Sequence, residues 1–401
     1  MHHQLVENLV SVWWIAAVAA LAPILALITR RYVPDVVWLL AFGALIGPNL
    51  LGLAEQTQAV EFLRELGMGF LFLLAGFEVN TSDMRAKAGR RAAWTWLICA
   101  ALGIGASFFL VHGQWQAAVA FGIASTSTAL GTLLPILKDS GTMNTPLGKA
   151  VLVHGAYGEL LPIVAMSLLL STRGTGVSAA LLVLFAVLAV LAIAVPARFF
   201  RRVPLLARAL SQASNSTMQT MMRMTVLLLV TLMLVTAVFD LDVALGAFAA
   251  GILANAVLKA IKAEHASEVM HKVEVLGFSF LIPVFFVTSG MNINLSQVIA
   301  QWPLLLAFVG LIILVRGLPV FLREQFASQT SELGSVRERL ALGFYAATGL
   351  PIIVAVTQIA GSSGILSEVA VSVMVTGGAL TVLVFPAVAK LLGGKPASMA
   401  T

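Results

Sequence analysis

Long apolar runs separated by short polar segments extend from one end of the chain to the other. Each run is bounded by charge, proline or glycine, and a membrane-spanning helix needs about 20 predominantly apolar residues. Thirteen runs meet this description, beginning near Val10, Pro34, Phe62, Ala92, Ala117, Leu147, Val177, Met224, Val243, Val273, Trp302, Leu340 and Ile365. The pattern predicts an all-α polytopic membrane protein with 13 transmembrane helices.

Composition supports this class. Of the 401 residues, 60% are hydrophobic and 10% are charged, whereas an ordinary soluble domain has roughly 25% charged residues. The single cysteine, Cys99, lies inside an apolar run, which argues against a disulfide framework and a cysteine-based metal cluster. The loops between the runs are short, so we expect no soluble catalytic or nucleotide-binding domain, no cofactor and no enzyme activity.

The basic residues indicate the topology. If the N-terminus lies outside, 21 of the 24 Lys and Arg residues fall in connections on the inner side, as the positive-inside rule requires. A missed or invented span would reverse every later assignment, so this asymmetry also supports the number of spans. We predict a multi-pass protein of the cell membrane with its C-terminus in the cytoplasm. The net charge of +6 then needs no nucleic-acid partner.

Two pairs of segments suggest an internal repeat. The segment 41–49 shares five of nine residues with 247–255, and 70–80 resembles 284–294 in the same order. The second span runs inward to outward whereas the ninth runs the other way, so the repeats are predicted to be inverted. We assign 1–171 to a first six-helix repeat, 172–222 to a linker helix with a basic inner loop, and 223–401 to a second repeat.

Inverted repeats are typical of secondary transporters, whose sites lie near mid-membrane between broken helices. Candidate breaks lie in the fifth span, at GIASTSTALG (122–131), and in the twelfth, at YAATGLP (345–351). Broken helices free backbone carbonyls and present half-helix dipoles to an ion. The alternative is that these small residues serve only close helix packing.

Two ionisable residues lie deep inside predicted spans, where a charge is costly. Glu159 lies about halfway along the sixth span and Arg316 well inside the eleventh. Glu159 is a candidate for binding a proton and a cation alternately, or else it is a permanent structural partner of an arginine. Arg316 is either its counter-ion or a partner of carbonyls freed by the breaks. His154 is either a packed histidine or a proton relay.

Several motifs together resemble the sodium/proton exchanger superfamily, in its monovalent cation:proton antiporter-2 branch, which includes the potassium efflux antiporters. They are LLAFGALIGPNLLGL, FLFLLAGFEVN, ASTSTAL, LGAFAAGILAN and FLIPVFFVTSGMNIN. The resemblance covers nearly the whole chain. It implies 13 spans, an outside N-terminus and two inverted six-helix repeats around broken crossing helices.

The resemblance also implies roles for individual residues. Glu159 follows Gly148 and Lys149 at the spacing of the family's ion-binding aspartate, and Gly158 precedes it where many relatives have Asp, Asn or Gln. A single acid goes with electroneutral exchange in this family. The other residues of the predicted site are the hydroxyl residues Ser125, Thr126, Ser127, Thr128 and Thr348, the charge partner Arg316, and the helix breaks Gly349 and Pro351.

The sequence therefore predicts exchange of Na⁺ or K⁺ for H⁺ by alternating access. Spans 4–6 and 11–13 would form the moving core, and the remaining spans a scaffold within the lipid bilayer that forms a homodimer. Two alternatives are a passive cation channel and a proton-coupled transporter of organic solutes on the same fold. A membrane metalloprotease is disfavoured because HGAYGE is not the H-E-x-x-H zinc motif.

Overall fold

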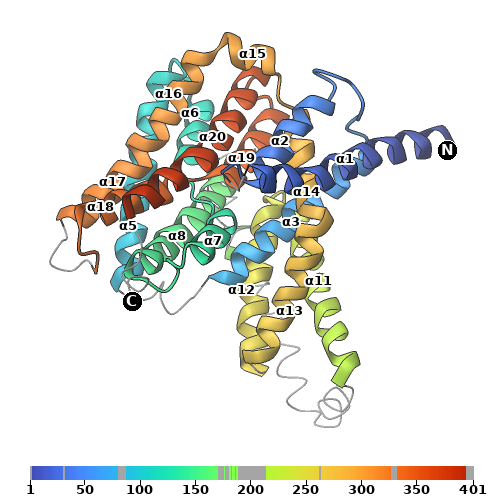
Figure 1. The fold of residues 1–401 in the computed structure, drawn as a ribbon, viewed down its shortest axis with the longest axis horizontal. Helices are drawn as coiled ribbons and strands as arrows, with labels where there is room; N and C mark the ends of the chain where they lie inside the picture. The colour runs from blue at the N-terminus through green and yellow to red at the C-terminus, as the bar shows by residue number, and fades with distance from the viewer. Residues whose placement is uncertain are drawn as a thin grey trace. The chain divides into compact units, whose positions relative to one another are not determined.

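The structure, a computed structural model, describes residues 2–29, 32–79, 87–169, 214–261, 263–326 and 332–393, with seven further helical residues between 176 and 187. Every regular element in these residues is a helix (Figure 1). They are α1 (His2–Ile28), α2 (Asp35–Ile46), α3 (Gln58–Glu78), α5 (Lys87–Leu110), α6 (Trp115–Ser125), α7 (Leu130–Asp139), α8 (Pro146–Leu169), α11 (Ser214–Val238), α12 (Val243–Ile261), α13 (Ala263–Leu276), η1 (Gly277–Leu281), α14 (Ile282–Met291), α15 (Leu295–Ala300), α16 (Trp302–Ile312), η2 (Ile313–Gly317), α17 (Leu318–Phe326), α18 (Val336–Ala346), α19 (Leu350–Ser362) and α20 (Glu368–Gly393).

Nine helical stretches within the described residues are long and apolar enough to cross a membrane, and α2 and α12 are shorter apolar helices. Two of the nine contain a pair of helices joined by a short break, namely 115–134 and 336–362. Most of the predicted seventh span and most of the basic inner loop before Ser214 lie outside the described residues. The expectation of an all-helical protein is confirmed for the described residues, whereas the count of thirteen spans stays a prediction.

The chain divides into two compact units. The first comprises Met1–Phe62, Asn80–Met166 and Pro283–Thr401, and the second comprises Leu63–Val79 and Ser167–Ile282. In the first unit, α6 packs between α5 and α19, and α20 packs along α16, α18 and α19 (Figure 1). The π-helical turn η2 contacts α5, α16, α17 and α18. All the residues of the predicted ion-binding site lie in this first unit.

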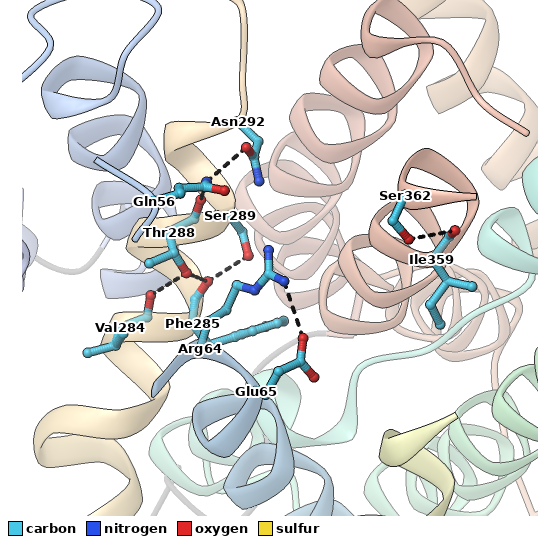
Figure 2. Close-up of polar contacts among 10 residues, drawn as sticks. All are labelled: Gln56, Arg64, Glu65, Val284, Phe285, Thr288, Ser289, Asn292, Ile359 and Ser362. Atoms are coloured by element: carbon cyan, nitrogen blue, oxygen red, sulfur yellow. Dashed lines mark hydrogen bonds and ion pairs between the residues drawn. The ribbon is translucent and has the colours of Figure 1, made fainter. Parts of the chain in front are cut away.

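Helices α2 and α14 approach closely in the first unit because glycine faces the partner backbone on both sides. A Cβ atom on Gly43 would collide with the backbone of α14, and one on Gly290 would collide with the backbone of α2. At the end of this contact, Asn49 Nδ2 donates to the carbonyl of Met291 at 3.4 Å. Gln56 Nε2 donates to the Thr288 carbonyl at 3.1 Å (Figure 2).

Helices α3 and α12 make an equivalent contact in the second unit. A Cβ atom on Gly76 would collide with the backbone of α12, and one on Gly251 would collide with the backbone of α3. Here Asn255 Nδ2 donates to the carbonyl of Phe77. Small residues that let two backbones approach in this way are typical of helix contacts inside membranes.

Candidate ion-binding site

Two broken helices meet at the centre of the candidate site. Helix α6 ends at Ser125 and α7 begins at Leu130, while α18 ends at Ala346 and α19 begins at Leu350. The breaks are hydrogen-bonded to each other, because the Ala129 amide donates to the Thr348 carbonyl at 2.6 Å. The crossing of these two non-helical segments satisfies backbone groups that a membrane interior cannot solvate.

The residues of the first break explain why the helix stops there. The hydroxyls of Ser125, Thr126 and Ser127 donate to the carbonyls three residues before them, at 2.7–2.8 Å. Such local bonds offer the backbone an alternative to the helical ladder. Each hydroxyl thereby donates its proton to a carbonyl, and its oxygen lone pairs remain available to accept a bond or to ligate a cation.

Glycine and proline define the second break. Gly349 lies against the break in the other helix. Its carbonyl shares the Ser127 hydroxyl proton, at 3.0 Å, with the Ala124 carbonyl, and a Cβ atom at Gly349 would collide with Ser127. Pro351 lies at the start of α19, where a helix does not need the missing N–H. The Thr348 side chain donates back to α18, to the Phe344 carbonyl at 3.1 Å, and the Thr348 backbone carbonyl makes the crossing contact.

Glu159 faces this crossing from α8. Its side chain is 2% exposed, and its Oε1 atom accepts the backbone N–H of Leu130 at 3.1 Å. Leu130 is the first residue of α7, so the carboxylate lies at the positive end of a half-helix. The neighbouring bond from the Thr128 amide to the Gly158 carbonyl, at 2.9 Å, holds α8 against the break.

Arg316 joins three segments of the site. It lies in the π-helical turn η2 and is fully buried. Its Nη2 atom donates to the Thr128 hydroxyl at 3.0 Å and to the His154 carbonyl at 2.8 Å. Its Nε atom donates to the same hydroxyl at 3.2 Å and to the Ala346 carbonyl at 3.4 Å. The guanidinium thus links both broken helices to α8.

Gly158 leaves the space that this guanidinium fills. A Cβ atom at position 158 would collide with Thr128 Oγ1 and would lie 2.5 Å from Arg316 Nη2. The thiol of Cys99, on α5, is buried close enough to the guanidinium to interact with it electrostatically. Helix α8 therefore presents one carboxylate here, from Glu159. The positively charged guanidinium of Arg316 occupies the space beside Gly158.

His154 has a carboxylate partner that the sequence did not suggest. Its Nε2 atom lies 3.7 Å from Oε1 of Glu324 on α17, and the side chains are 7% and 18% exposed respectively. The contact joins α8 to the same helix that follows Arg316. Glu324 lies near a predicted span end, so nothing in the one-dimensional pattern distinguished it from an ordinary interfacial acid.

The structure brings most of the predicted residues together. Hydrogen bonds between the two breaks link Ser127, Thr128, Thr348 and Gly349, with Thr128 bonded to the last residue of α18. Glu159 is bonded to Leu130, the first residue after the first break. Ser125 and Thr126 instead lie against Gly103 of α5, whose Cβ position would be 3.2 Å from each of their side chains. Sequence reasoning singled out Gly158 for its missing carboxylate but did not foresee the space that it leaves for Arg316, and it missed the contributions of Cys99 and Glu324.

The groups at the crossing that could bind a cation are oxygen atoms. They comprise one carboxylate, several hydroxyl groups and backbone carbonyls, and within the described part of the chain no group of three His, Cys, Asp or Glu residues is arranged to hold a resident metal ion. Oxygen atoms of this kind can replace the hydration shell of an alkali cation. The carboxylate can alternatively take a proton.

The transmembrane sodium/hydrogen exchanger family profile matches residues 16–392. The chain belongs to this family. The resemblance inferred from the sequence motifs is thereby confirmed, and the protein is a multi-pass membrane protein. The curated relatives are cation/proton antiporters, which are transporters rather than enzymes.

Individual relatives are distant in sequence but similar in extent. The Na⁺/H⁺-K⁺ antiporter GerN of Bacillus cereus is 24% identical over 365 residues, which cover 90% of each chain. YjbQ of Bacillus subtilis is 25% identical over 392 residues, covering 92% of this chain, and the chain spans 60% of that relative's length. The solved sodium proton antiporter MjNhaP1 of Methanocaldococcus jannaschii has a TM-score of 0.64 at 19% identity, with 97% of this chain and all of that chain covered. This likeness shows that the fold is shared.

Proposed function

We propose that the protein is a secondary active transporter that exchanges Na⁺ or K⁺ for H⁺ by alternating access. The observation that carries the proposal is the position of Glu159, which is 2% exposed and bonded to the first residue of a half-helix where two broken helices cross. The family and the names of its members, including Na⁺/H⁺ antiporters and the Na⁺/H⁺-K⁺ antiporter GerN, support cation/proton exchange.

Glu159 would couple the two fluxes through the cost of burying a charge. A carboxylate that holds a proton or a cation is neutral and can cross the barrier with the moving part of the protein. A bare carboxylate cannot, because an uncompensated charge inside the membrane is too costly. Candidates to complete a cation's coordination are the Ser127 hydroxyl and the Thr348 carbonyl at the crossing, and the Ser125 and Thr126 hydroxyls on the side of α5. The Thr128 hydroxyl, which accepts from Arg316, would join them only by exchanging that partner.

We propose that exchange is electroneutral, with one proton for one cation. Gly158 supplies no second carboxylate beside Glu159, and the Arg316 guanidinium fills the adjacent space. Arg316 would act throughout the cycle as a fixed positive charge that ties both broken helices to α8. A single titrating carboxylate then carries one proton in one direction and one Na⁺ or K⁺ ion in the other.

His154 is proposed as a relay that passes protons toward Glu159. Its ring lies 3.7 Å from Glu324, which is the more exposed of the two. The ring and Glu159 belong to the same helix, and the His154 carbonyl is bonded to Arg316. A proton taken up by Glu324 could thus reach the interior through one histidine.

Thirteen spans in two inverted six-helix repeats remain our proposal for the whole chain, with repeats at 1–171 and 223–401 and a linker at 172–222. Two equivalent hydrogen bonds support it: Asn49 binds the carbonyl of Met291, and Asn255 binds the carbonyl of Phe77. In the matched segments, Asn49 corresponds to Asn255 and Phe77 to Met291. In each repeat, the equivalent asparagine therefore donates to the equivalent backbone carbonyl of the other repeat.

The rest of the arrangement follows from the same plan. Spans 4–6 and 11–13 would move as a core against a scaffold formed by the other spans, and the scaffold would associate as a homodimer in the bilayer. The N-terminus would lie outside and the C-terminus in the cytoplasm, as the distribution of Lys and Arg favours.

The decisive experiment measures proton movement in proteoliposomes with a pH-sensitive dye. In the wild type, adding Na⁺ or K⁺ should dissipate a preformed proton gradient. Glu159→Gln should abolish this cation-dependent dissipation. Glu368→Gln, which changes an exposed carboxylate at the start of α20, is the matched control. Cation flux without proton movement would indicate a channel, and proton movement driven only by organic solutes would indicate a symporter. Either result, or wild-type exchange by Glu159→Gln, would overturn the proposal.

A further inference from the structure

The N-terminal part of α5 carries an unusual group of side chains on its surface. Lys87, Arg90, Arg91 and Trp94 line a hollow of about 440 Å³. Their spacing, i, i+3, i+4 and i+7, places all four on one face of the helix. We call these four residues the α5 basic patch.

The cations of the patch have no acidic partners in the described part of the chain. None of the ion pairs formed there involves Lys87, Arg90 or Arg91. Elsewhere on the surface, by contrast, Lys272 lies 3.3 Å from Glu268 one helical turn away. Three like charges on adjacent turns repel one another unless an anion lies between them.

The same helix face continues as an apolar surface beyond Trp94. Trp94 itself is 69% exposed, and Leu97, Ile98 and Leu102 are 47%, 54% and 49% exposed. Exposed side chains of this kind on a spanning helix face lipid tails, and tryptophan is enriched at the level of the headgroups. Three chemically distinct zones therefore follow each other along one face of α5: cations, an indole ring and aliphatic side chains.

We propose that the α5 basic patch is a binding site for an acidic phospholipid. The headgroup phosphate would accept charge-assisted hydrogen bonds from Lys87, Arg90 and Arg91. The Trp94 indole would lie at the ester level, and the acyl chains would follow Leu97, Ile98 and Leu102. A zwitterionic lipid carries its own ammonium group and does not match three unpaired cations, whereas acidic lipids do.

The position of the site gives the lipid a route to the transport machinery. Helix α5 packs against α6, which ends at the first break, and against η2, which carries Arg316. Its buried face contributes Cys99 and Gly103 to the surroundings of the ion-binding residues. A bound acidic lipid would restrain the exposed face of α5. The buried face of α5 packs against the ion-binding residues.

Lipid binding can be measured on the purified full chain by native mass spectrometry with added phosphatidylglycerol or phosphatidylcholine. The variant K87Q/R90Q/R91Q should bind phosphatidylglycerol about tenfold or more weakly than wild type, since each basic residue near a membrane surface contributes substantially to attraction. The control K138Q/K149Q/K390Q removes three exposed lysines and the same net charge outside the patch. It should bind as wild type does. Equal losses in both variants would overturn the proposal.

A second measurement does not depend on the triple variant folding. Brominated phosphatidylglycerol should quench the tryptophan fluorescence of the wild type more than brominated phosphatidylcholine does, and Trp94→Phe should remove most of that difference. An unchanged difference in Trp94→Phe would contradict the site. If the triple variant instead alters self-association while phosphatidylglycerol binding persists, this face contacts a second copy of the chain and the lipid proposal is wrong.

Discussion

The absence of a side chain at Gly158 makes room for the guanidinium of Arg316. A Cβ atom there would lie 2.5 Å from Arg316 Nη2 and would collide with Thr128, to which that nitrogen donates. The residue type at position 158, directly before the candidate ion-binding Glu159, thus determines whether the Arg316 side chain fits. One position therefore helps to determine both the number of carboxylates in the site and the position of its fixed cation.

Gly158→Ala should destabilise the protein by about 1–3 kcal/mol, because the added methyl group overpacks a filled interior. Thermal unfolding in detergent micelles, followed by tryptophan fluorescence, measures the change. Gly105→Ala is the matched control, since a Cβ atom at Gly105 has nothing within 4 Å. Equal stability of the two variants would show that the space beside Arg316 can expand at little cost.

Arg316→Met should cost stability because it removes the charged donor to the Thr128 hydroxyl and to the carbonyls of His154 and Ala346, although the Ala346 carbonyl keeps its bond from Thr128. A hydrogen bond from a charged group contributes about 1.5–3 kcal/mol. Arg316→Lys should fall between the wild type and Arg316→Met, since a lysine keeps the charge but lacks the planar fork that reaches several oxygens. Arg337→Met, at an exposed arginine of α18, should unfold at the wild-type temperature.

Gly349→Ala should damage both stability and exchange. Its Cβ atom would approach the Ser127 backbone carbonyl oxygen to 2.7 Å, and backbone cannot rotate away as a side chain can. We expect reduced thermal stability together with reduced exchange in proteoliposomes, since the two breaks are forced apart. Gly310→Ala, where the space is open, provides the comparison. Normal exchange by Gly349→Ala would argue against close contact of the breaks during transport.

Asp242 should make stability depend on pH. Burial, reinforced by the charge of Glu65 and opposed by the Ala244 amide, raises the pKa of this carboxyl from 3.8 to about 7. Because the pKa is higher in the folded state, the contribution to stability is fully present below pH 3.8 and is lost as the pH rises through about 7.

Asp242→Asn removes this titration and retains an oxygen to accept the Ala244 N–H, which Asp242 Oδ1 now accepts at 2.8 Å. Relative to wild type, the variant should gain about 2–3 kcal/mol between about pH 5 and pH 8. Unfolding temperatures across that range measure the gain. Parallel curves for the two proteins would show that Asp242 does not titrate there.

Much of the architecture could be predicted because it rests on one-dimensional patterns. The need to satisfy backbone polar groups inside a bilayer requires long apolar helices, so the apolar runs that lie in the described residues are helical. The hydroxyl-rich and glycine-rich stretches form the breaks at Thr126–Ala129 and Ala347–Gly349. Glu159 and Arg316 were found because charges are rare inside spans. Their scarcity made them visible without any knowledge of contacts.

The sequence by itself determined that the chain is a helical membrane protein, where its spans break, and which two buried charges need a purpose. Only the tertiary structure decided what those charges touch: Glu159 accepts the Leu130 amide, and Arg316 donates to Thr128, His154 and Ala346. These partners are mostly backbone atoms far away in the chain. Every residue carries the same backbone groups, so no side-chain pattern can identify which carbonyl will face an arginine until the helices have packed.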